Sequence, residues 1–484
     1  MKKKLKLLTT TCVALSLSFT FAGCSSDQAY VTSIRFAGTN GNGTDYAVAY
    51  SDGREETLTI ANGRDDEDCT SAAVSIDDVY AKYVAENGEI SYADFLREYL
   101  TLTTDTTAAA GRCLQSSLKV YTTFVESASA VGPGLGGWAT SKRYSNTLHT
   151  GSAVIWKIDG SSVYIVTNYH VIYDNNADET ANGGKTAKEI YCYLYGSEGT
   201  PAASGKKDET YGYSQYEFGE YAVQCELIGG SITTDLAVLK ADASALKAIN
   251  PEIRAVTPAS GYSVGETAMA IGNPEGAGIS VTKGIVSVDN EYIALKIDDT
   301  ARYYRSIRTD SSLYSGNSGG GLFNGDGELI GITNAGNTDD QNINYAIPVD
   351  IVTGAVENIL HYHSDGNDDT EGAYKISLGL TVRARNAKYV YDAKNGSGKI
   401  VEEIVVDSVA EQSIAERLGL AAKDAITGIE IDGTEYSISR NFEVSDLLFR
   451  VWEGSVVRIS FIRDGKAQTT EAYSVRFSDL TRIP

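Results

Sequence analysis

Proline and histidine are scarce in this chain, with seven and four residues out of 484, whereas glycine is frequent, with 48. Few prolines and many glycines are typical of many short strands joined by tight turns. The hydrophobic fraction of 42% and the aromatic fraction of 9% exclude a disordered chain. The length exceeds what one ordinary core can hold, so we expect two to four domains.

An excess of positive charge is also missing. Lys and Arg number 41 against 64 Asp and Glu, which gives a net charge of −23. Loss of the lysine-bearing leader described below would take this value to about −27. Because binding to nucleic-acid phosphates requires a cationic surface, we exclude nucleic acid as a partner.

Local metal-ligand spacings are absent as well. The chain has no CxxC motif and no Cys/His ligand spacing, and its acidic residues near the N-terminus lack the 12-residue loop pattern of calcium sites. We therefore predict no metal and no cofactor.

The N-terminus carries an apolar stretch of the kind that directs a protein for export. Four lysines precede an apolar run at 12–22, which is too short to span a bilayer comfortably, so residues 1–23 are predicted to be a removed leader. Phe21-Ala22-Gly23-Cys24 resembles a bacterial lipoprotein cleavage site. This resemblance implies acylation of Cys24 and attachment to the extracytoplasmic face of the cell membrane. An ordinary secretory signal with an incidental cysteine is the alternative.

Four cysteines remain after the leader and Cys24 are set aside, and an even count in an exported protein permits two disulfides. They are Cys69, Cys113, Cys192 and Cys225. Cys192 and Cys225 lie in strand-like runs, 189–195 and 221–228, that could pair as neighbours. Whether a bridge forms is left open.

Two small regions are predicted before the main body of the chain. Residues 24–68 alternate in polarity and carry an Asp52-Gly53 turn signal, which indicates a small antiparallel β-meander. Residues 69–111 are predicted to hold two short helices, with caps at Ser75 and Ser91. No role is assigned to either region.

Residues 112–363 form the predicted main domain. Short apolar runs alternate there with Gly, Asn and Asp turns, which is typical of an all-β barrel or sandwich. Within it, we expect a polar, Tyr-rich surface loop at 197–219 and a helix at 349–360. A polar linker, 364–373, separates a last domain at 374–484.

Ser318 is the candidate nucleophile, within Gly316-Asn317-Ser318-Gly319-Gly320. Flanking glycines permit a tight turn whose N–H groups, those of Gly316 and Ser318, could stabilise an oxyanion. His170 is the candidate base because it follows the strand signal 164–166, whereas the other three histidines lie in polar or helix-end positions. Asp235, directly before the apolar run 236–239, is favoured over the polar-turn residue Asp174 as the acid that orients the base.

Together these motifs resemble the trypsin-like serine proteases, and more closely their bacterial HtrA/Deg branch. The order His, Asp, Ser is that of the chymotrypsin-type triad. The matching segments are Gly151-Ser152-Ala153-Val154-Ile155, Thr167-Asn168-Tyr169-His170-Val171, Thr234-Asp235-Leu236-Ala237-Val238-Leu239-Lys240, Ala270-Ile271-Gly272-Asn273-Pro274, Val281-Thr282-Lys283-Gly284-Ile285-Val286-Ser287, the Ser318 motif, and Asn344-Tyr345-Ala346-Ile347-Pro348. The resemblance implies a mainly β fold, a double β-barrel with the triad between the barrels, and endopeptidase activity on unfolded or exported proteins. Oligomers occur in the family, and the oligomeric state of this chain is left open.

The same resemblance places Ser312 at the floor of the primary specificity pocket, six residues before the nucleophile. An aspartate there would select Arg or Lys. We therefore predict cleavage after small or medium apolar residues.

The last domain resembles a PDZ domain through Ser377-Leu378-Gly379-Leu380, which matches a carboxylate-binding loop. Val444, Leu447, Leu448 and Val451 fit a helix beside a peptide groove. The stretch 386–399 could cover or reshape that groove. Two functions follow: an active endopeptidase with a peptide-binding domain, or a catalytically silent binding or chaperone-like surface protein.

Overall fold

The computed structural model describes the backbone of residues 31–40, 43–50, 55–61, 84, 106–134, 137–336, 342–364, 372–392 and 397–484. The chain divides into two compact units, 1–103 and 104–484. In the first unit, strands β1 (Val31–Asn40), β2 (Gly43–Tyr50) and β3 (Glu55–Ala61) form an antiparallel sheet in that order. The predicted meander is thereby confirmed. The two predicted short helices lie outside the described residues, apart from position 84.

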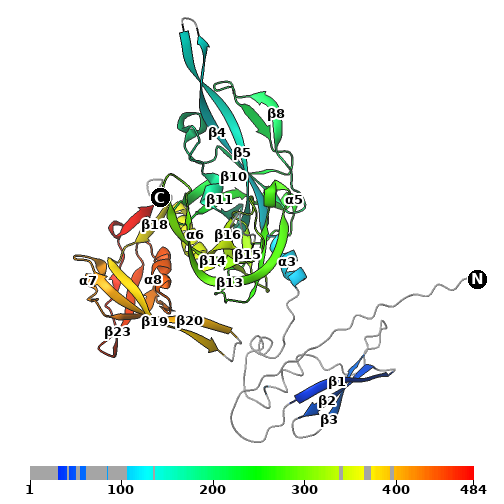
Figure 1. Cartoon of the computed structure of the whole chain (residues 1–484), viewed down its shortest axis with the longest axis vertical. Helices are drawn as coiled ribbons and strands as arrows, with labels where there is room; N and C mark the ends of the chain where they lie inside the picture. Colours follow the sequence, from blue (N-terminus) through cyan, green and yellow to red (C-terminus); the bar gives the residue numbers. More distant parts are fainter. Residues whose placement is uncertain are drawn as a thin grey trace, which may run out of the picture. The chain divides into compact units, whose positions relative to one another are not determined.

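A first six-stranded barrel closes in the order β10-β11-β6-β5-β4-β7 (Figure 1). Its inward positions are filled mainly by Val, Ile and Leu side chains that are almost fully buried. The strands are β4 (Ser117–Gly134), β5 (Gly137–Asp159), β6 (Ser162–Thr167), β7 (Glu189–Leu194), β10 (Val223–Ser231) and β11 (Leu236–Asp242). Short helical segments between them are α4 (Tyr169–Ile172), η1 (Glu179–Gly183) and α5 (Ala243–Ile249).

A second six-stranded barrel closes in the order β12-β13-β14-β17-β16-β15. Its strands are β12 (Thr267–Gly272), β13 (Ser280–Leu295), β14 (Arg302–Thr309), β15 (Gly321–Phe323), β16 (Leu329–Gly336) and β17 (Asn344–Pro348), with the turn η2 (Pro274–Gly276) after β12. The two barrels confirm the predicted mainly β, double-barrel fold.

Helix α6 (Val349–Ser364) extends four residues beyond the predicted 349–360 and packs on both barrels. Its buried side chains recur at the three- and four-residue spacing of one helical face: Val352, Ala355, Val356 and Ile359. Full burial of each Val or Ile contributes about 1.5–3 kcal/mol. Helix α3 (Thr106–Leu114) adds Ala109 and Cys113 to the same core. The core between the barrels is therefore closed by helices from both ends of the domain.

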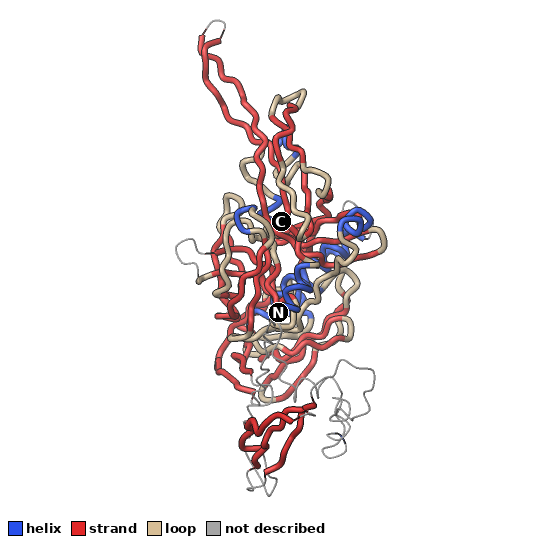
Figure 2. Tube along the Cα trace, turned by 90° about the vertical axis from the view of Figure 1, so that its right-hand side faces the viewer, coloured by secondary structure: helices blue, strands red, loops and turns tan. Residues whose placement is uncertain are grey.

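Strands β4 and β5 continue past the barrel as a two-stranded arm, visible in Figures 1 and 2. Beside it, β8 (Ala202–Lys207) pairs with β9 (Ser214–Glu217). The stretch predicted as a plain surface loop, 197–219, is therefore a hairpin. Tyr213 and Phe218 are buried, and the Phe218 ring stacks on Tyr191 at 3.9 Å between centroids. Aromatic packing, which polarity alone did not reveal, explains the difference.

The C-terminal domain consists of a sheet with short helices on it. The sheet order is β19-β20-β21-β23-β24, β22 and β25 pair at its margins, and β18 pairs separately with β26. The strands are β18 (Ala373–Ile376), β19 (Leu380–Asp392), β20 (Ser397–Val409), β21 (Ala425–Ile431), β22 (Thr434–Ser437), β23 (Val456–Arg463), β24 (Lys466–Thr469), β25 (Tyr473–Ser474) and β26 (Leu480–Ile483). The helical segments are α7 (Ile414–Arg417), α8 (Asn441–Leu447), η4 (Leu448–Arg450) and η5 (Phe477–Asp479).

The disulfide question left open by the sequence concerns four cysteines, three of which lie among the described residues. Strands β7 and β10 pair as predicted, with Val223 opposite Cys192. However, Cys192 and Cys225 are free thiols, and so is Cys113. Hydrogen bonding to Cys192, together with burial, raises the pKa of the Cys225 thiol well above its usual value. The two sulfurs are thus neighbours without a bridge. Cys69 lies outside the described residues.

Candidate active site

His170 and Asp235 form a close pair at the ends of two neighbouring strands. His170 lies in α4, directly after β6, and Asp235 precedes β11. The imidazole Nδ1 lies 2.9 Å from Oδ2 and 3.0 Å from Oδ1 of the carboxylate. The backbone N–H of His170 donates to Oδ1 at 3.0 Å. The structure thus brings together these two predicted residues.

The backbone around Asp235 is held in an uncommon conformation. Its φ is +55°, in the left-handed region that Asp tolerates better than most residues. Its carbonyl accepts hydrogen bonds from the backbone N–H of Tyr169 at 3.1 Å and from Asn168 Nδ2 at 3.0 Å. The carboxylate therefore orients the imidazole, while the carbonyl holds the preceding residues of the His170 segment.

The environment favours a protonated imidazole. Burial lowers the pKa of His170, but the negative charge of Asp235 and the hydrogen bond to it outweigh this effect, so the pKa is raised above the usual 6.5. Asp235 is fully buried, while the imidazole remains 29% exposed. Part of the imidazole is therefore accessible to a reacting group.

Ser318 lies in the turn between β14 and β15, and this turn packs against the segment that carries His170. The Ser318 carbonyl accepts from Ser152 N at 2.8 Å. A Cβ placed on Gly319 would lie 2.2 Å from Thr167 Oγ1 and 3.1 Å from Asn168 N, so only glycine permits this approach. Among the described residues, no hydrogen bond joins the Ser318 hydroxyl to His170. Such bonds are often long before substrate binds.

The two predicted oxyanion donors are not used elsewhere. Gly316 has φ +97°, and a Cβ there would lie 2.3 Å from the carbonyl of Asn273. Within the described parts of the chain, neither the N–H of Gly316 nor that of Ser318 donates to another residue. Two backbone donors next to a serine hydroxyl are the arrangement that acyl transfer requires.

Ser152 is a supporting residue that the sequence reasoning missed. It is fully buried, donates to Gly316 O at 2.7 Å, and accepts from Asn273 N at 2.8 Å. It thereby connects the first barrel to the turn that carries Ser318. The sequence signal that could have identified Ser152 is its place in the family-like motif that begins at Gly151.

Ser312 lies on the loop between β14 and β15, six residues before Ser318, and is half-buried. Its carbonyl accepts from Thr282 Oγ1 at 2.9 Å. The hydrogen bond ties the loop to β13.

Comparison with known proteins agrees with this geometry. Residues 151–332 match the family described as a trypsin-like peptidase domain. The chain is 26% identical over 334 residues to the serine protease Do-like HtrA of Lactococcus lactis subsp. lactis, covering 66% of this chain and 69% of that protein. The chain is 29% identical over 326 residues to the protein of the same name in Bacillus subtilis, and the match covers 66% of this chain and 62% of that protein.

These matches support an HtrA-type serine protease with a trypsin-like peptidase domain. Among solved structures, it is also similar to the HtrA-type protease AlgW with a decapeptide, at 25% identity, covering 77% of this chain and 99% of that chain, with a TM-score of 0.43.

The C-terminal domain of the protease contains a groove of about 380 Å³ between β19 and α8. All four residues of the predicted loop, 377–380, line it, and Val444 and Leu448 face them from the helical side. Lys375 and Ser445 also line it, and the Lys375 ammonium donates to Ser445 Oγ at 2.8 Å. Among the described residues of 386–399, none lines the groove. These residues belong to β19 and β20.

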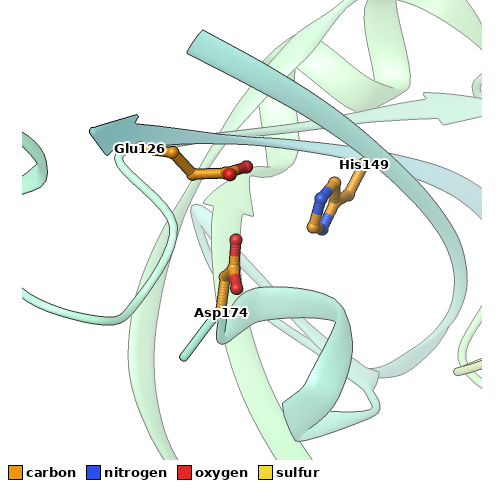
Figure 3. A group of neighbouring side chains, drawn as sticks. All are labelled: Glu126, His149 and Asp174. Carbon is orange, nitrogen blue, oxygen red and sulfur yellow. The ribbon is translucent and has the colours of Figure 1, made fainter. Parts of the chain in front are cut away.

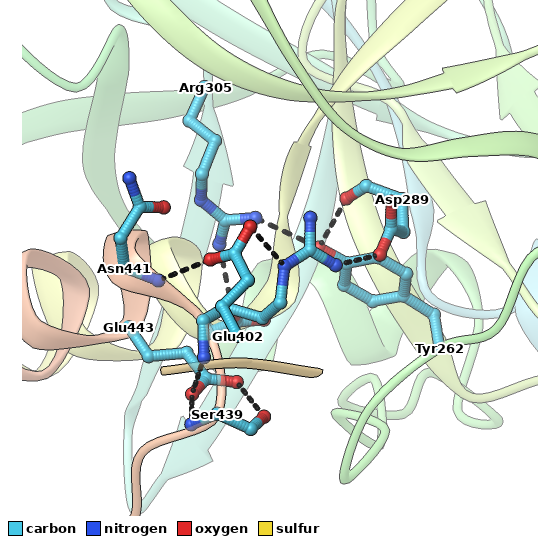
Figure 4. Close-up of polar contacts among 9 residues, drawn as sticks. Tyr262, Asp289, Arg305, Glu402, Ser439, Asn441 and Glu443 are labelled. Carbon is cyan, nitrogen blue, oxygen red and sulfur yellow. Dashed lines mark hydrogen bonds and ion pairs between the residues drawn. The ribbon is translucent and has the colours of Figure 1, made fainter. Parts of the chain in front are cut away.

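Charged contacts join this domain to the second barrel (Figure 4). The Arg305 side chain on β14 is 3% exposed, pairs with Asp446 of α8 at 2.7 Å and with Asp350 at 2.8 Å, and donates to the Tyr262 hydroxyl. Arg440 pairs with Asp289 of β13. Burial raises the pKa of Asp446 to about 6, against the opposing charge of Arg305. The helix that lines the groove is therefore bonded directly to the barrel.

Proposed function

We propose that the protease cleaves peptide bonds through a triad of Ser318, His170 and Asp235. His170 takes the proton of the Ser318 hydroxyl as the oxygen attacks the scissile carbonyl, and Asp235 orients the imidazole and stabilises its cation. The N–H groups of Gly316 and Ser318 bind the oxyanion, each contributing about 3 kcal/mol to transition-state stabilisation. The observation that carries this proposal is the His170–Asp235 pair, with its buried carboxylate and partly exposed imidazole, beside the turn of Ser318.

The decisive experiment compares cleavage of casein by the purified protease, its Ser318→Ala variant and its Ser315→Ala variant. Ser315 is an exposed serine of the same turn and serves as the matched control. We expect loss of cleavage only in Ser318→Ala. A serine-directed organophosphorus reagent should add its mass to the peptide that contains residue 318. Equal cleavage by the wild type and Ser318→Ala would refute the assignment.

Unfolded or exported proteins are the proposed substrates, with cleavage after small or medium apolar residues. The absence of a carboxylate at Ser312 supports this preference, because Arg or Lys would bring an unpaired charge into the pocket. A peptide library with all residues at the cleaved position measures it. Predominant cleavage after Arg or Lys would contradict the proposal.

The C-terminal groove is proposed to bind peptide C-termini in the manner of a PDZ domain. The φ of +70° at Gly379 and its close packing on Ser413 support a tight loop with available backbone donors. Each charged hydrogen bond to a carboxylate contributes about 1.5–3 kcal/mol. A fluorescent peptide should therefore lose at least about tenfold in affinity when its C-terminus is amidated. Equal binding of the free and the amidated peptide would exclude this mode.

Membrane attachment is proposed to occur through a lipid on Cys24, at the extracytoplasmic face. The basic, apolar and small-residue segments before Cys24 support it. In the described part of the chain, no helix has the length and apolarity needed to cross a membrane. Metabolic labelling with a fatty-acid analogue should mark the wild type and not a Cys24→Ala variant. Equal labelling of both would refute lipidation.

A catalytically silent binding or chaperone-like protein is the second candidate. The missing hydrogen bond between Ser318 and His170 is the observation that favours it. Retained peptide binding in the groove, together with no cleavage and no labelling of Ser318, would establish this alternative.

A further inference from the structure

Three potential metal ligands from separate parts of the first barrel converge outside the catalytic pair. Glu126 lies on β4, His149 on β5, and Asp174 in the turn that follows α4. One ligand atom from each lies within 4.8 Å of the other two, and Figure 3 shows the three side chains around a common centre. The ligands are 23 and 25 residues apart in the sequence, so no local spacing motif contains them.

The negative charge of this group is not balanced by protein cations. Among the ion pairs of the described residues, none includes Glu126 or Asp174. The nearby Lys185 directs its ammonium to the carbonyls of Asn175 and Ala177, at 2.9 and 2.7 Å. Asp174 is only 8% exposed. Two carboxylates this close in a partly buried position repel each other unless a cation lies between them.

The other contacts of the group leave coordinating atoms available. Glu126 Oε1 accepts a hydrogen bond from the Thr147 hydroxyl, and Asp174 Oδ1 accepts from Asn176 N at 2.8 Å. Each carboxylate therefore keeps its second oxygen. The His149 ring packs on Phe124 with 4.9 Å between centroids, which fixes the ring on one face. Such outer contacts orient metal ligands.

The donor set selects the type of ion. Calcium and magnesium take oxygen ligands, whereas an imidazole nitrogen with two carboxylates suits zinc and related transition metals. Ligand atoms about 2.1 Å from zinc in a tetrahedron lie about 3.4 Å apart. The three ligand atoms already lie within 4.8 Å of one another, close to that spacing. We propose that Glu126, His149 and Asp174 bind one divalent transition-metal ion, zinc in preference, with water as the fourth ligand.

The position of this zinc site gives it a structural role next to the active site. Asp174 lies two residues after α4, the helix of His170, and Thr122 Oγ1 of β4 donates to Val171 O in the same helix at 3.0 Å. Metal binding would therefore cross-link β4, β5 and the turn that ends α4. The ion acts as a clamp on the segment that carries the catalytic base and does not take part in peptide hydrolysis.

Zinc binding to the metal-free protease, measured by competition with a chromophoric chelator, tests the site. We expect one ion per chain with a dissociation constant of about 1 μM or below, and at least tenfold weaker binding in each of Glu126→Gln, His149→Asn and Asp174→Asn. Glu189→Gln is the matched control, because this carboxylate lies on the adjacent β7 and contacts Thr123 outside the group. It should bind zinc as the wild type does.

Cobalt substitution in the wild type provides a readout that does not depend on how the variants fold. The visible absorption of tetrahedral cobalt should appear at one equivalent of the metal. X-ray absorption of the same sample should show a nitrogen ligand on the cobalt. Zinc should also raise the melting temperature of the wild type and not that of His149→Asn. No zinc binding to the wild type, or unchanged affinity in His149→Asn, would overturn the proposal.

Discussion

Replacing Ser152 by alanine tests whether the catalytic turn depends on its connection to the first barrel. The change removes one hydroxyl and leaves Asn273 N and Gly316 O without this hydrogen-bond partner. Because Ser152 is fully buried, water cannot easily replace the hydroxyl. An unpaired buried N–H costs about 1–3 kcal/mol, so we expect stability to fall by about that amount.

The effect on catalysis follows from the position of Gly316, whose N–H is a proposed oxyanion donor. Without the hydrogen bond to its carbonyl, Gly316 can change its backbone dihedral angles, and this change would turn its N–H away from the oxyanion position. If half of the donor's ~3 kcal/mol is lost, the rate falls by about tenfold. We therefore expect Ser152→Ala to lower kcat about tenfold, with a smaller change in KM, since the interaction is made mainly in the transition state.

A matched variant separates this effect from general destabilisation. Ser117 is 1% exposed and donates a single hydrogen bond to Cys113 O at 2.9 Å, at the start of β4. Ser117→Ala should lose stability and keep its kcat per folded molecule. Peptide-substrate kinetics and thermal melts on both variants provide the comparison. An unchanged kcat in Ser152→Ala, with a melting temperature as low as that of Ser117→Ala, would refute the reasoning.

Three further predictions concern charge and backbone. Because the pKa of His170 is raised, we expect kcat/KM to fall as pH decreases through a value above 6.5. The protonated imidazole contributes to the stability of the folded protein, and this contribution is lost as pH rises through the same value. Asp235→Asn should move the imidazole titration, followed by NMR, to lower pH. Asp446 has a pKa raised to about 6, so its protonated carboxyl contributes stability below about pH 4 that is lost as pH rises through 6. The melting temperature of Asp446→Asn should therefore exceed that of the wild type at pH 7.5 but not at pH 4. Gly319→Ala should abolish cleavage because its Cβ would lie 2.1 Å from Ser152 O, whereas Gly327→Ala, with a similar φ of +83° against +87° and no contact below 3.2 Å, should stay active.

Much of the double barrel is predictable because its strands are locally encoded. The apolar runs at 164–166 and 236–239 lie within β6 and β11, which pair antiparallel. His170 and Asp235 each follow or precede one of these strands, so pairing places them at the same edge. The sequence therefore indicated which residues could meet. It could not give the +55° φ of Asp235 or the double clamp of its carbonyl, which depend on the turn in three dimensions.

Other features depend on contacts between distant segments and have no local signal. In the sequence, the arm of β4 and β5 consists of two polar stretches that give no sign of pairing. The hairpin at 202–217 is stabilised by aromatic rings that pack on β7. The ion pair of Arg305 and Asp446 connects residues 141 positions apart. The sequence does not distinguish such paired, buried charges from solvated surface charges, because the two differ only in their burial in the folded protein.

The zinc ligands illustrate this limit most clearly. A spacing rule detects ligands that a single turn or helix brings together, whereas barrel closure brings together side chains from any two paired strands. The register places Thr122 opposite His149 and Glu126 opposite Ser145, so the acid and the imidazole lie four residue pairs apart along the same two strands. Asp174 completes the group only because α4 turns the chain back towards β4, where Ala177 bridges Glu126. The fold that positions His170 therefore also assembles the metal ligands, and the two sites share α4 as their common support.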